Sequence, residues 1–247
     1  MVAEELINAA KSGDIDPVDI LNAYLYKACS DTKKFNSVTG VIPGARVLAK
    51  SLSENRADFF NSNLYALPVS LKECIMTKGM DSTIGYTSLI GKPALDDSVI
   101  VKVLKSCGAV PFVKTNLVQS MQSFESGNPI FGVTGNPHNV DFTPGGSSSG
   151  EGSLIGSGGS PLGFGTDIGG SIRAPAHLSG CCGLKPTKGR LSNLGLQGSL
   201  PGQSCLFASI GPMAPNVDTL VLAMRALACP LMFELDQNLP PLPFNEE

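Results

Sequence analysis

Two short turns combine paired glycines with a serine, and each could present a hydroxyl to a reacting group. They are Gly145-Gly146-Ser147 and Gly169-Gly170-Ser171, whose serines lie 24 residues apart; 11 of the 26 residues from 145 to 170 are glycine. Glycine costs conformational entropy on folding, so this density is expected only where the backbone needs a positive φ or must approach another group closely. The pattern predicts an active site built from serine hydroxyls and backbone amides.

A lysine could supply the base that these turns lack. Lys72 follows the apolar run LPVSL at positions 67–71, which is typical of a buried strand. A lysine ordinarily lies at the surface with a pKa of ~10.4, but desolvation can lower that pKa by ~3–5 units and leave a neutral amine. If Lys72 is buried, it can therefore accept a proton from a serine hydroxyl.

Other interpretations of the glycine-rich stretch explain less. A flexible linker would not need the apolar side chains, or the charged Asp167 and Arg173, that interrupt the stretch. The sequence contains neither of the glycine fingerprints that bind nucleotide phosphates. Its two histidines and the adjacent Cys181 and Cys182 do not form the spaced ligand set of a metal site. We therefore expect no metal and no cofactor.

Residues 146–150 also match G-x-S-x-G, the nucleophile elbow of α/β-hydrolases, with Ser148 at its centre. That mechanism needs an acidic residue and then a histidine further along the chain. Asp167 and His177 follow so soon that they could hardly come from separate loops. We therefore disfavour this mechanism and interpret His177 as an ordinary, partly buried histidine.

Capping residues and apolar spacing predict the elements that position these groups. Helices are expected over 2–12, 16–33, 44–55, 97–106 and 218–229, with shorter ones from Ser147 or Ser148 to Ile155 and from Ser171 onward, and strands over 37–42, 67–71, 109–113 and 162–167. A strand, a helix and a second strand in succession indicate a parallel crossover. The sequence predicts a layered α/β fold, with a mixed or mainly parallel sheet flanked by helices.

The domain organisation follows from these elements. We expect one partial domain over 1–247, with a helical N-terminal segment over about 1–60 and a catalytic α/β core over about 61–232. The proline-rich segment 233–247 is expected to be extended.

Composition and charge exclude several classes of partner. The net charge of −3 leaves no broad positive field, so we expect no nucleic-acid partner. Seven cysteines, an odd number without a C-x-x-C pair, and an N-terminus unlike a signal peptide favour an intracellular protein with reduced thiols. No run approaches the ~18 apolar residues that would span a bilayer.

Three motifs together resemble the amidase signature family: PGGSSSGEG at 144–152, GTDIGGSIR at 165–173 and GLKPT at 183–187. The similarity extends over nearly the whole chain and is strongest to the members that hydrolyse fatty acid amides. The resemblance implies a Ser-Ser-Lys triad, in which Ser171 is the nucleophile, Ser147 the bridging serine and Lys72 the base and later the acid.

The same resemblance assigns supporting roles. It implies an oxyanion hole formed by the amides of Ile168, Gly169, Gly170 and Ser171. It implies that Ser148 and Arg173 hold the turns by hydrogen bonds, that Met121 lines the substrate site, and that the peptide bond between Gly146 and Ser147 is cis.

The resemblance also sets the expected function and its alternatives. We expect a serine hydrolase that cleaves fatty acid amides and esters through an acyl-enzyme, with a small lipid amide as its substrate. Because members of the family are much longer, this chain is expected to be an N-terminal part of the catalytic domain, incomplete on its C-terminal side. For the full-length protein the resemblance implies peripheral association with endomembranes and a homodimer. The alternatives are a soluble amidase, an amidotransferase A-type subunit, and an inactive truncated fragment.

Overall fold

The computed structural model describes residues 2–200, 202–203 and 205–245. Six strands form one sheet in the order β1 (Val38–Val41), β3 (Val110–Thr115), β2 (Pro68–Lys72), β6 (Gly163–Asp167), β8 (Ser209–Ala214) and β7 (Cys182–Gly183). Strand β2 runs parallel to both of its neighbours, β3 and β6, and the outer pairings are antiparallel. The sheet is therefore mixed, which confirms the predicted α/β fold, and the parallel strands β2, β3 and β6 place their carboxyl ends at one edge.

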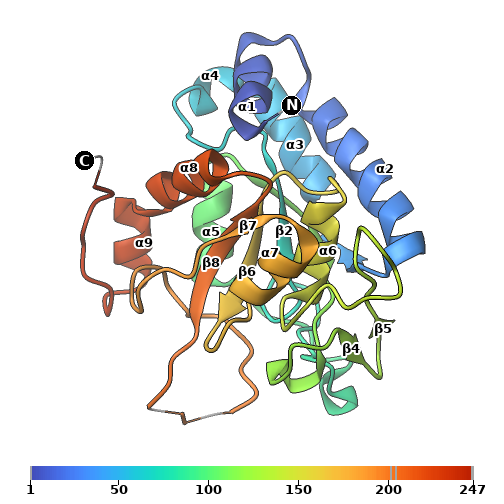
Figure 1. The fold of residues 1–247 in the computed structure, drawn as a ribbon. Helices are drawn as coiled ribbons and strands as arrows, with labels where there is room; N and C mark the ends of the chain where they lie inside the picture. The colour runs from blue at the N-terminus through green and yellow to red at the C-terminus, as the bar shows by residue number, and fades with distance from the viewer. Residues whose placement is uncertain (1, 201, 204, 246–247) are drawn as a thin grey trace.

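Helices cover both faces of the sheet (Figure 1). One face is covered by α2 (Pro17–Phe35), α3 (Ala45–Glu54) and α6 (Ser149–Gly156), and the other by α5 (Val99–Ser106), α8 (Val217–Leu227) and α9 (Pro230–Leu235). The remaining helices are α1 (Ala3–Ser12), α4 (Arg56–Phe59) and α7 (Arg173–Ser179), and a two-stranded ribbon is formed by β4 (Gly127–Asn128) and β5 (Gly132–Val133). The two crossovers from β2 to β3 and from β3 to β6 thus pass over opposite faces, which opens the edge at Lys72 between them.

Local signals predicted most of these boundaries. Helix α2 begins where expected, because the Asp16 carboxylate accepts a hydrogen bond of 2.8 Å from the N–H of Val18 and Pro17 occupies the first helical position. Of the two expected N-cap residues of α6, Ser147 and Ser148, the structure has Ser148, but its side chain makes no capping hydrogen bond. Helix α7 begins at Arg173, two residues later than the prediction from Ser171.

The sequence patterns did not predict α4, α9 or the strands β4, β5, β7 and β8. Strand β8 reads SIGPMA, and its internal Gly211 and Pro212 hide the strand pattern, since both residues are unusual inside strands. A Cβ on Gly211 would lie 2.2 Å from the carbonyl oxygen of Leu184, so the glycine allows the neighbouring chain to approach. Helix α9 extends to Leu235, three residues into the segment that was expected to be extended.

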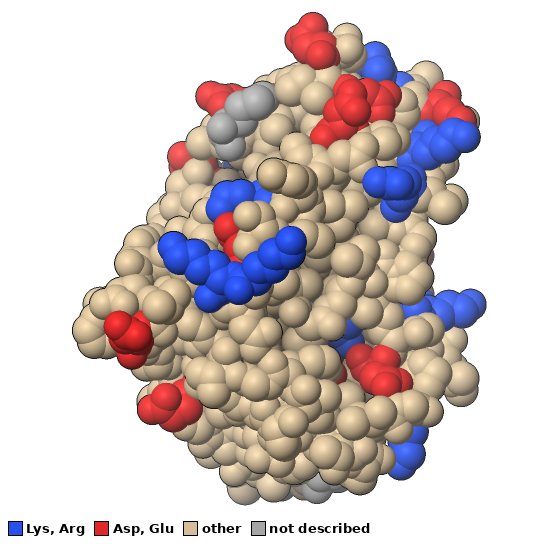
Figure 2. All heavy atoms as spheres, turned by 90° about the vertical axis from the view of Figure 1, so that its right-hand side faces the viewer, with Lys and Arg blue, Asp and Glu red and all other residues tan. Residues whose placement is uncertain are grey.

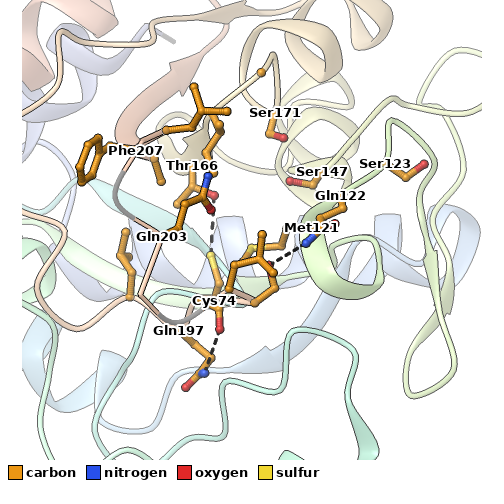
Figure 3. A pocket seen from close by; sticks show the side chains of 18 of the residues that line it. Cys74, Met121, Gln122, Ser123, Ser147, Thr166, Ser171, Gln197, Gln203 and Phe207 are labelled. Carbon is orange, nitrogen blue, oxygen red and sulfur yellow. Dashed lines mark hydrogen bonds between the residues drawn. The ribbon is translucent and has the colours of Figure 1, made fainter.

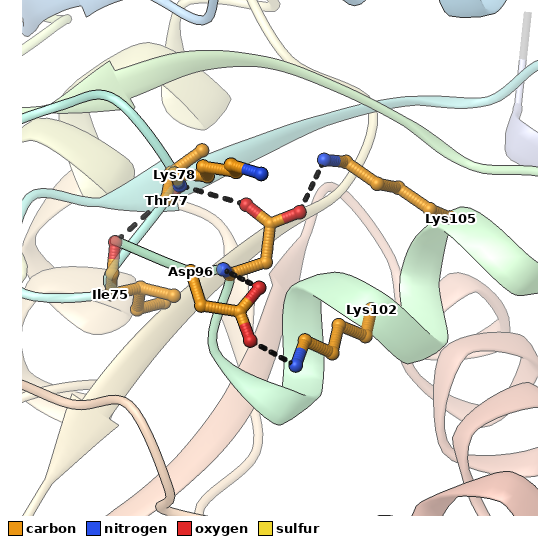
Figure 4. A network of polar contacts seen from close by, with 7 residues as sticks. Ile75, Thr77, Lys78, Asp96, Lys102 and Lys105 are labelled. Carbon is orange, nitrogen blue, oxygen red and sulfur yellow. Dashed lines mark hydrogen bonds and ion pairs between the residues drawn. The ribbon is translucent and has the colours of Figure 1, made fainter. Parts of the chain in front are cut away.

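The segment between β2 and α5 is fastened to α5 by ion pairs (Figure 4). Asp96 pairs with Lys102 and Asp97 pairs with Lys105, while the N–H of Lys78 donates to Asp97 over 2.8 Å. The Asp96–Lys102 pair is exposed, and such pairs typically contribute only ~0–1 kcal/mol, whereas Asp97 is largely buried. Their effect here is to fix the path of the chain after β2, the strand that carries Lys72.

Candidate active site

Lys72 ends β2 inside the protein, with none of its surface exposed. Its Nζ donates hydrogen bonds to Ser147 Oγ over 2.8 Å and to Thr166 Oγ1 over 2.9 Å. Burial lowers the pKa of Lys72 to about 8, although nearby acidic groups, Asp167 and Glu151 among them, act in the opposite direction. A substantial fraction of the amine is therefore neutral near physiological pH, and it lies within hydrogen-bonding distance of a serine.

The first glycine turn presents Ser147 between Lys72 and a cavity that Ser147 helps to line. The Gly146–Ser147 peptide bond is cis. A Cβ on Gly146 would lie 2.3 Å from the carbonyl oxygen of Glu125, so this position leaves no room for a side chain. The N–H of Ser148 donates to the carbonyl oxygen of Ser171 over 3.1 Å, which joins the first turn directly to the second.

The second turn is organised by a buried carboxylate at the end of β6. Asp167 accepts hydrogen bonds from the N–H groups of Gly170 (2.8 Å) and Ile172 (3.1 Å) and from Arg173 Nε (3.0 Å). Burial alone would raise the pKa of Asp167, but these donors lower it to about 2. Arg173 thus holds the turn through Asp167, which extends the supporting role implied for it.

Backbone amides around Ser171 differ in whether they are free to bind a ligand. The N–H of Gly170 is already bonded to Asp167, contrary to its expected place in an oxyanion hole. Within the described part of the chain, the N–H groups of Ile168, Gly169 and Ser171 donate to no protein acceptor. Three of the four expected donors therefore remain available beside the Ser171 hydroxyl.

Ser147 and Ser171 both line one cavity of about 500 Å³ (Figure 3). The side chains around it are mainly apolar, with several amides and hydroxyls between them. The other residues that line the cavity are Cys74, Met121, Gln122, Ser123, Phe124, Thr166, Ile168, Gly169, Leu196, Gln197, Gly198, Ser199, Leu200, Gln203, Leu206, Phe207 and Ala208. The two serines are close in this wall, but no hydrogen bond joins their hydroxyls among the described residues.

Met121 lines this cavity from an unusual backbone conformation. Both Ser120 and Met121 have positive φ angles, 60° and 61°, which non-glycine residues rarely adopt. The N–H of Ser120 donates to the carbonyl oxygen of Ile84 over 3.0 Å, and the N–H groups of Thr83 and Ile84 in turn donate to the buried carboxylate of Glu73. Glu73, the residue next to Lys72, therefore supports the loop that holds Met121 at the cavity wall.

Sequence reasoning missed three residues of this region. Thr166 bonds to Lys72, Cys74 lies at the cavity wall, and Glu151 is buried close enough to Lys72 to influence its pKa. Thr166 and Glu151 lie within the motifs at 165–173 and 144–152, and this location could have indicated a role at the site. Cys74 follows Lys72 by two residues and carried no signal of its own.

The alternative elbow mechanism at Ser148 finds no support. Asp167 is fully engaged with Arg173 and the turn amides, and His177 is exposed on α7 rather than partly buried. Ser148 is completely buried, and its Oγ has only a long, 3.5 Å contact to the carbonyl oxygen of Thr166. Its hydroxyl therefore cannot meet a substrate, whereas the Ser171 hydroxyl lies at the cavity.

Known proteins share both the sequence and the fold. Fatty-acid amide hydrolase 1 of Sus scrofa is 49% identical over 244 residues, which make up 98% of this chain and 41% of that protein. Vitamin D3 hydroxylase-associated protein of Gallus gallus is 44% identical over 243 residues, 98% of this chain and 52% of that protein. The chain thus spans about half the length, or less, of these relatives.

Solved structures agree. A structure of fatty acid amide hydrolase superposes with a TM-score of 0.95 at 34% identity and covers 100% of this chain and 44% of that one. Peptide amidase from Stenotrophomonas maltophilia gives a TM-score of 0.85 at 28% identity, with coverage of 92% and 47%. Residues 19–247 match the model of the Amidase family. The chain belongs to the amidase signature family.

Proposed function

We propose that the protein hydrolyses fatty acid amides, and the corresponding esters, through an acyl-enzyme on Ser171. The observation that carries this proposal is the buried Lys72 amine bonded to Ser147 Oγ at the wall of an apolar cavity that also holds Ser171. A serine hydroxyl at its ordinary pKa is a weak nucleophile and needs a base as it attacks. Lys72 is such a base.

In the proposed reaction, protons pass from Ser171 through Ser147 to Lys72, and then back through Ser147 to the leaving group. Ser171 Oγ bonds to the amide carbonyl carbon while its proton passes to Ser147 Oγ, and the proton of Ser147 passes to Lys72 Nζ. The tetrahedral intermediate then collapses, the carbon–nitrogen bond breaks, and the proton returns through Ser147 to the leaving nitrogen. Water then attacks the acyl-enzyme with the same proton transfers, and the carboxylic acid is released.

Two structural features bear on these steps. The free N–H groups of Ile168, Gly169 and Ser171 are suited to bind the developing oxyanion, and one such donor is typically worth ~3–4 kcal/mol in the transition state. No hydrogen bond joins Ser171 Oγ to Ser147 Oγ among the described residues, so the proposal requires the Ser171 side chain to rotate toward Ser147 when substrate binds. Hydrogen bonds between catalytic groups often tighten only in the complex with substrate.

The substrate class rests on the cavity and on the relatives. A mainly apolar lining suits a hydrocarbon chain, because burying each CH₂ group is worth ~0.8 kcal/mol. Two similar proteins, from Sus scrofa and Caenorhabditis elegans, are named as fatty acid amide hydrolases. Long-chain acyl amides are therefore the proposed substrates, in preference to short amides or glutamine.

Covalent labelling tests the proposal. A fluorophosphonate probe should label the purified protein at one serine, and Ser171→Ala should abolish that labelling. Lys72→Ala should slow it strongly at neutral pH, because the base is gone. Labelling that survives Ser171→Ala would disprove the nucleophile, and faster turnover of short amides or glutamine than of long-chain amides would favour the alternative amidases.

Membrane association and dimerisation rest on the family resemblance alone. None of the helices in the described residues is both long and apolar enough to cross a bilayer. We propose peripheral binding to membranes and a homodimer for the full-length protein. Co-sedimentation with phospholipid vesicles and analytical ultracentrifugation test these two proposals separately.

A further inference from the structure

Glu151 is a completely buried acid between α6 and the sheet. Its Oε2 accepts a hydrogen bond of 2.6 Å from Ser70 Oγ on β2, and its Oε1 accepts one of 2.8 Å from Thr115 Oγ1 on β3. A buried carboxyl group is costly unless such donors satisfy it. Both oxygens are satisfied here, each by a different strand of the sheet.

Strand β6, the other neighbour of β2, leaves room for the Glu151 carboxyl group. Gly163 on β6 pairs with Ser70 in the sheet, and a Cβ on Gly163 would lie 1.9 Å from Glu151 Oε2 and 2.5 Å from Ser70 Oγ. On the helix, a Cβ on Gly150 would lie 2.3 Å from the backbone nitrogen of Asn116. Glycines therefore let α6 approach the sheet closely, and Glu151 is the side chain that bonds the helix to β2 and β3.

Two contacts between β2 and the α6 segment run side by side. Lys72 bonds to Ser147, and Ser70 bonds to Glu151. The two residues on β2 are two positions apart, a rise of ~6.6 Å along a strand. Their partners belong to one segment, with Glu151 in the first turn of α6 and Ser147 directly before Ser148, the N-cap of that helix. Fixing the first turn of α6 against β2 therefore also limits where the chain can place Ser147 relative to Lys72.

We propose that Glu151 is a positioning residue, which fixes α6 against β2 and thereby holds Ser147 Oγ within hydrogen-bonding distance of Lys72 Nζ. This inference rests on the proposed function, since it concerns the proton path of that reaction. Glu151 does not line the cavity, so it acts through Ser147 and Lys72 rather than on the substrate.

Glu151 also contributes to the charge around Lys72. Burial raises the pKa of Glu151 to about 7, against the lowering effects of its hydroxyl donors and Lys72, so the carboxylate is mostly ionised near pH 8, where Lys72 loses its proton. Ionised Glu151 raises the pKa of Lys72. The other titratable groups that act on this pair are Glu73 and Cys74 after β2, Asp167 at the end of β6 and Cys181 after α7.

The test compares Glu151→Ala with Glu151→Gln in the purified protein, with fluorophosphonate labelling of Ser171 measured from pH 6 to 10 and circular dichroism to verify folding. Glu151→Ala should slow labelling by ~10–100-fold, the loss typical of a misplaced catalytic group, with a much smaller change in KM for the amide. Glu151→Gln should restore most of the rate, because its amide oxygen can accept from Ser70 and its amide nitrogen can donate to Thr115.

The pH profile of the labelling rate distinguishes a positioning role of Glu151 from a purely structural one. Because Glu151→Gln removes the carboxylate that raises the pKa of Lys72, the rise of its labelling rate should move to lower pH. Ser153→Ala is the matched control: Ser153 is buried on the same helix, but its Oγ donates to the carbonyl oxygen of Gly135 over 2.8 Å, away from β2. This variant should keep both the rate and the profile of the unmodified protein.

Each outcome decides one question. Labelling of Glu151→Ala at the unmodified rate, or a Glu151→Gln variant that is as slow as Glu151→Ala with an unshifted profile, would overturn the positioning role. If Glu151→Ala fails to fold, Ser70→Ala removes only the contact to β2 and should still slow labelling; an unchanged rate there also overturns the role. Labelling that does not depend on Ser171 or Lys72 would instead reject the proposed function.

Discussion

Helices α5 and α6, on opposite faces of the central sheet, bury different kinds of residue. Helix α6 buries small and polar residues against one face, namely Ser149, Gly150, Glu151, Gly152 and Ser153, followed by two apolar ones. Helix α5 buries only apolar residues on the other, namely Val99, Ile100, Val101, Val103 and Leu104. Apolar burial stabilises a fold at roughly 25 cal/mol per Å², whereas buried polar groups at best offset their desolvation.

This difference indicates a division between the two faces. Helix α5 stabilises the fold through apolar packing, and α6 with its N-terminal turn holds groups of the candidate active site by hydrogen bonds. Substitutions on α5 should therefore change stability, and substitutions of the groups that join α6 and its N-terminal turn to β2 should change activity.

Lys72→Met should lower kcat/KM for a long-chain amide by ~10³-fold or more, since loss of a base that works as part of a unit removes most of the catalysis. Its melting temperature should stay the same or rise, because the variant no longer buries an amine with a lowered pKa. Turnover and calorimetry measure the two effects. A variant that keeps its activity, or melts far below the unmodified protein, contradicts the division between the faces.

Leu104→Ala should produce the opposite result. Leu104 is completely buried on α5, and such truncations cost ~2–5 kcal/mol of unfolding free energy. The fluorophosphonate labelling rate per folded molecule should not change. Denaturant unfolding and titrated labelling check this pair of outcomes, and a slower rate in fully folded protein would show that the two faces are coupled.

Gly163→Ala should affect both properties, because its Cβ would collide with Glu151 Oε2. Crowding of this kind typically costs ~1–3 kcal/mol, and displacement of the carboxyl group should also slow labelling. Adding Glu151→Ala makes room for the new methyl group, so the double variant should be more stable than the sum of the single changes predicts. Strict additivity in unfolding measurements would show that the two groups do not compete for space.

The pH dependence is the finest test. Lys72 acts as a base only when neutral, so labelling should rise with pH through a pKa of about 8. The unfolded chain keeps this proton up to pH ~10.4, and stability therefore rises with pH between the two values. The melting-temperature difference between Lys72→Met and the unmodified protein should consequently shrink between pH 8 and 10. A constant difference would mean that Lys72 keeps its proton in the folded state.

Much of the fold could be predicted because its signals are local. The Asp16 cap and Pro17 define the start of α2, and the apolar run before Lys72 defines β2. Strand β8 was missed because Gly211 and Pro212 disguise it, and the glycine is needed there because a Cβ would collide with the carbonyl oxygen of Leu184. A signal of that kind depends on residues far away in the sequence.

The candidate site divides in the same way. By itself, the sequence determined which residue types gather in the two turns, the presence of Lys72 at a strand end and the family to which the motifs point, because each depends on residues next to one another. Only the tertiary structure decided that Thr166 meets Lys72, that Asp167 engages the N–H of Gly170, and that Glu151 bonds to two strands. These contacts depend on strand register and on how closely α6 approaches the sheet, and burial then lowers the pKa of Lys72 because the folded protein excludes water from it.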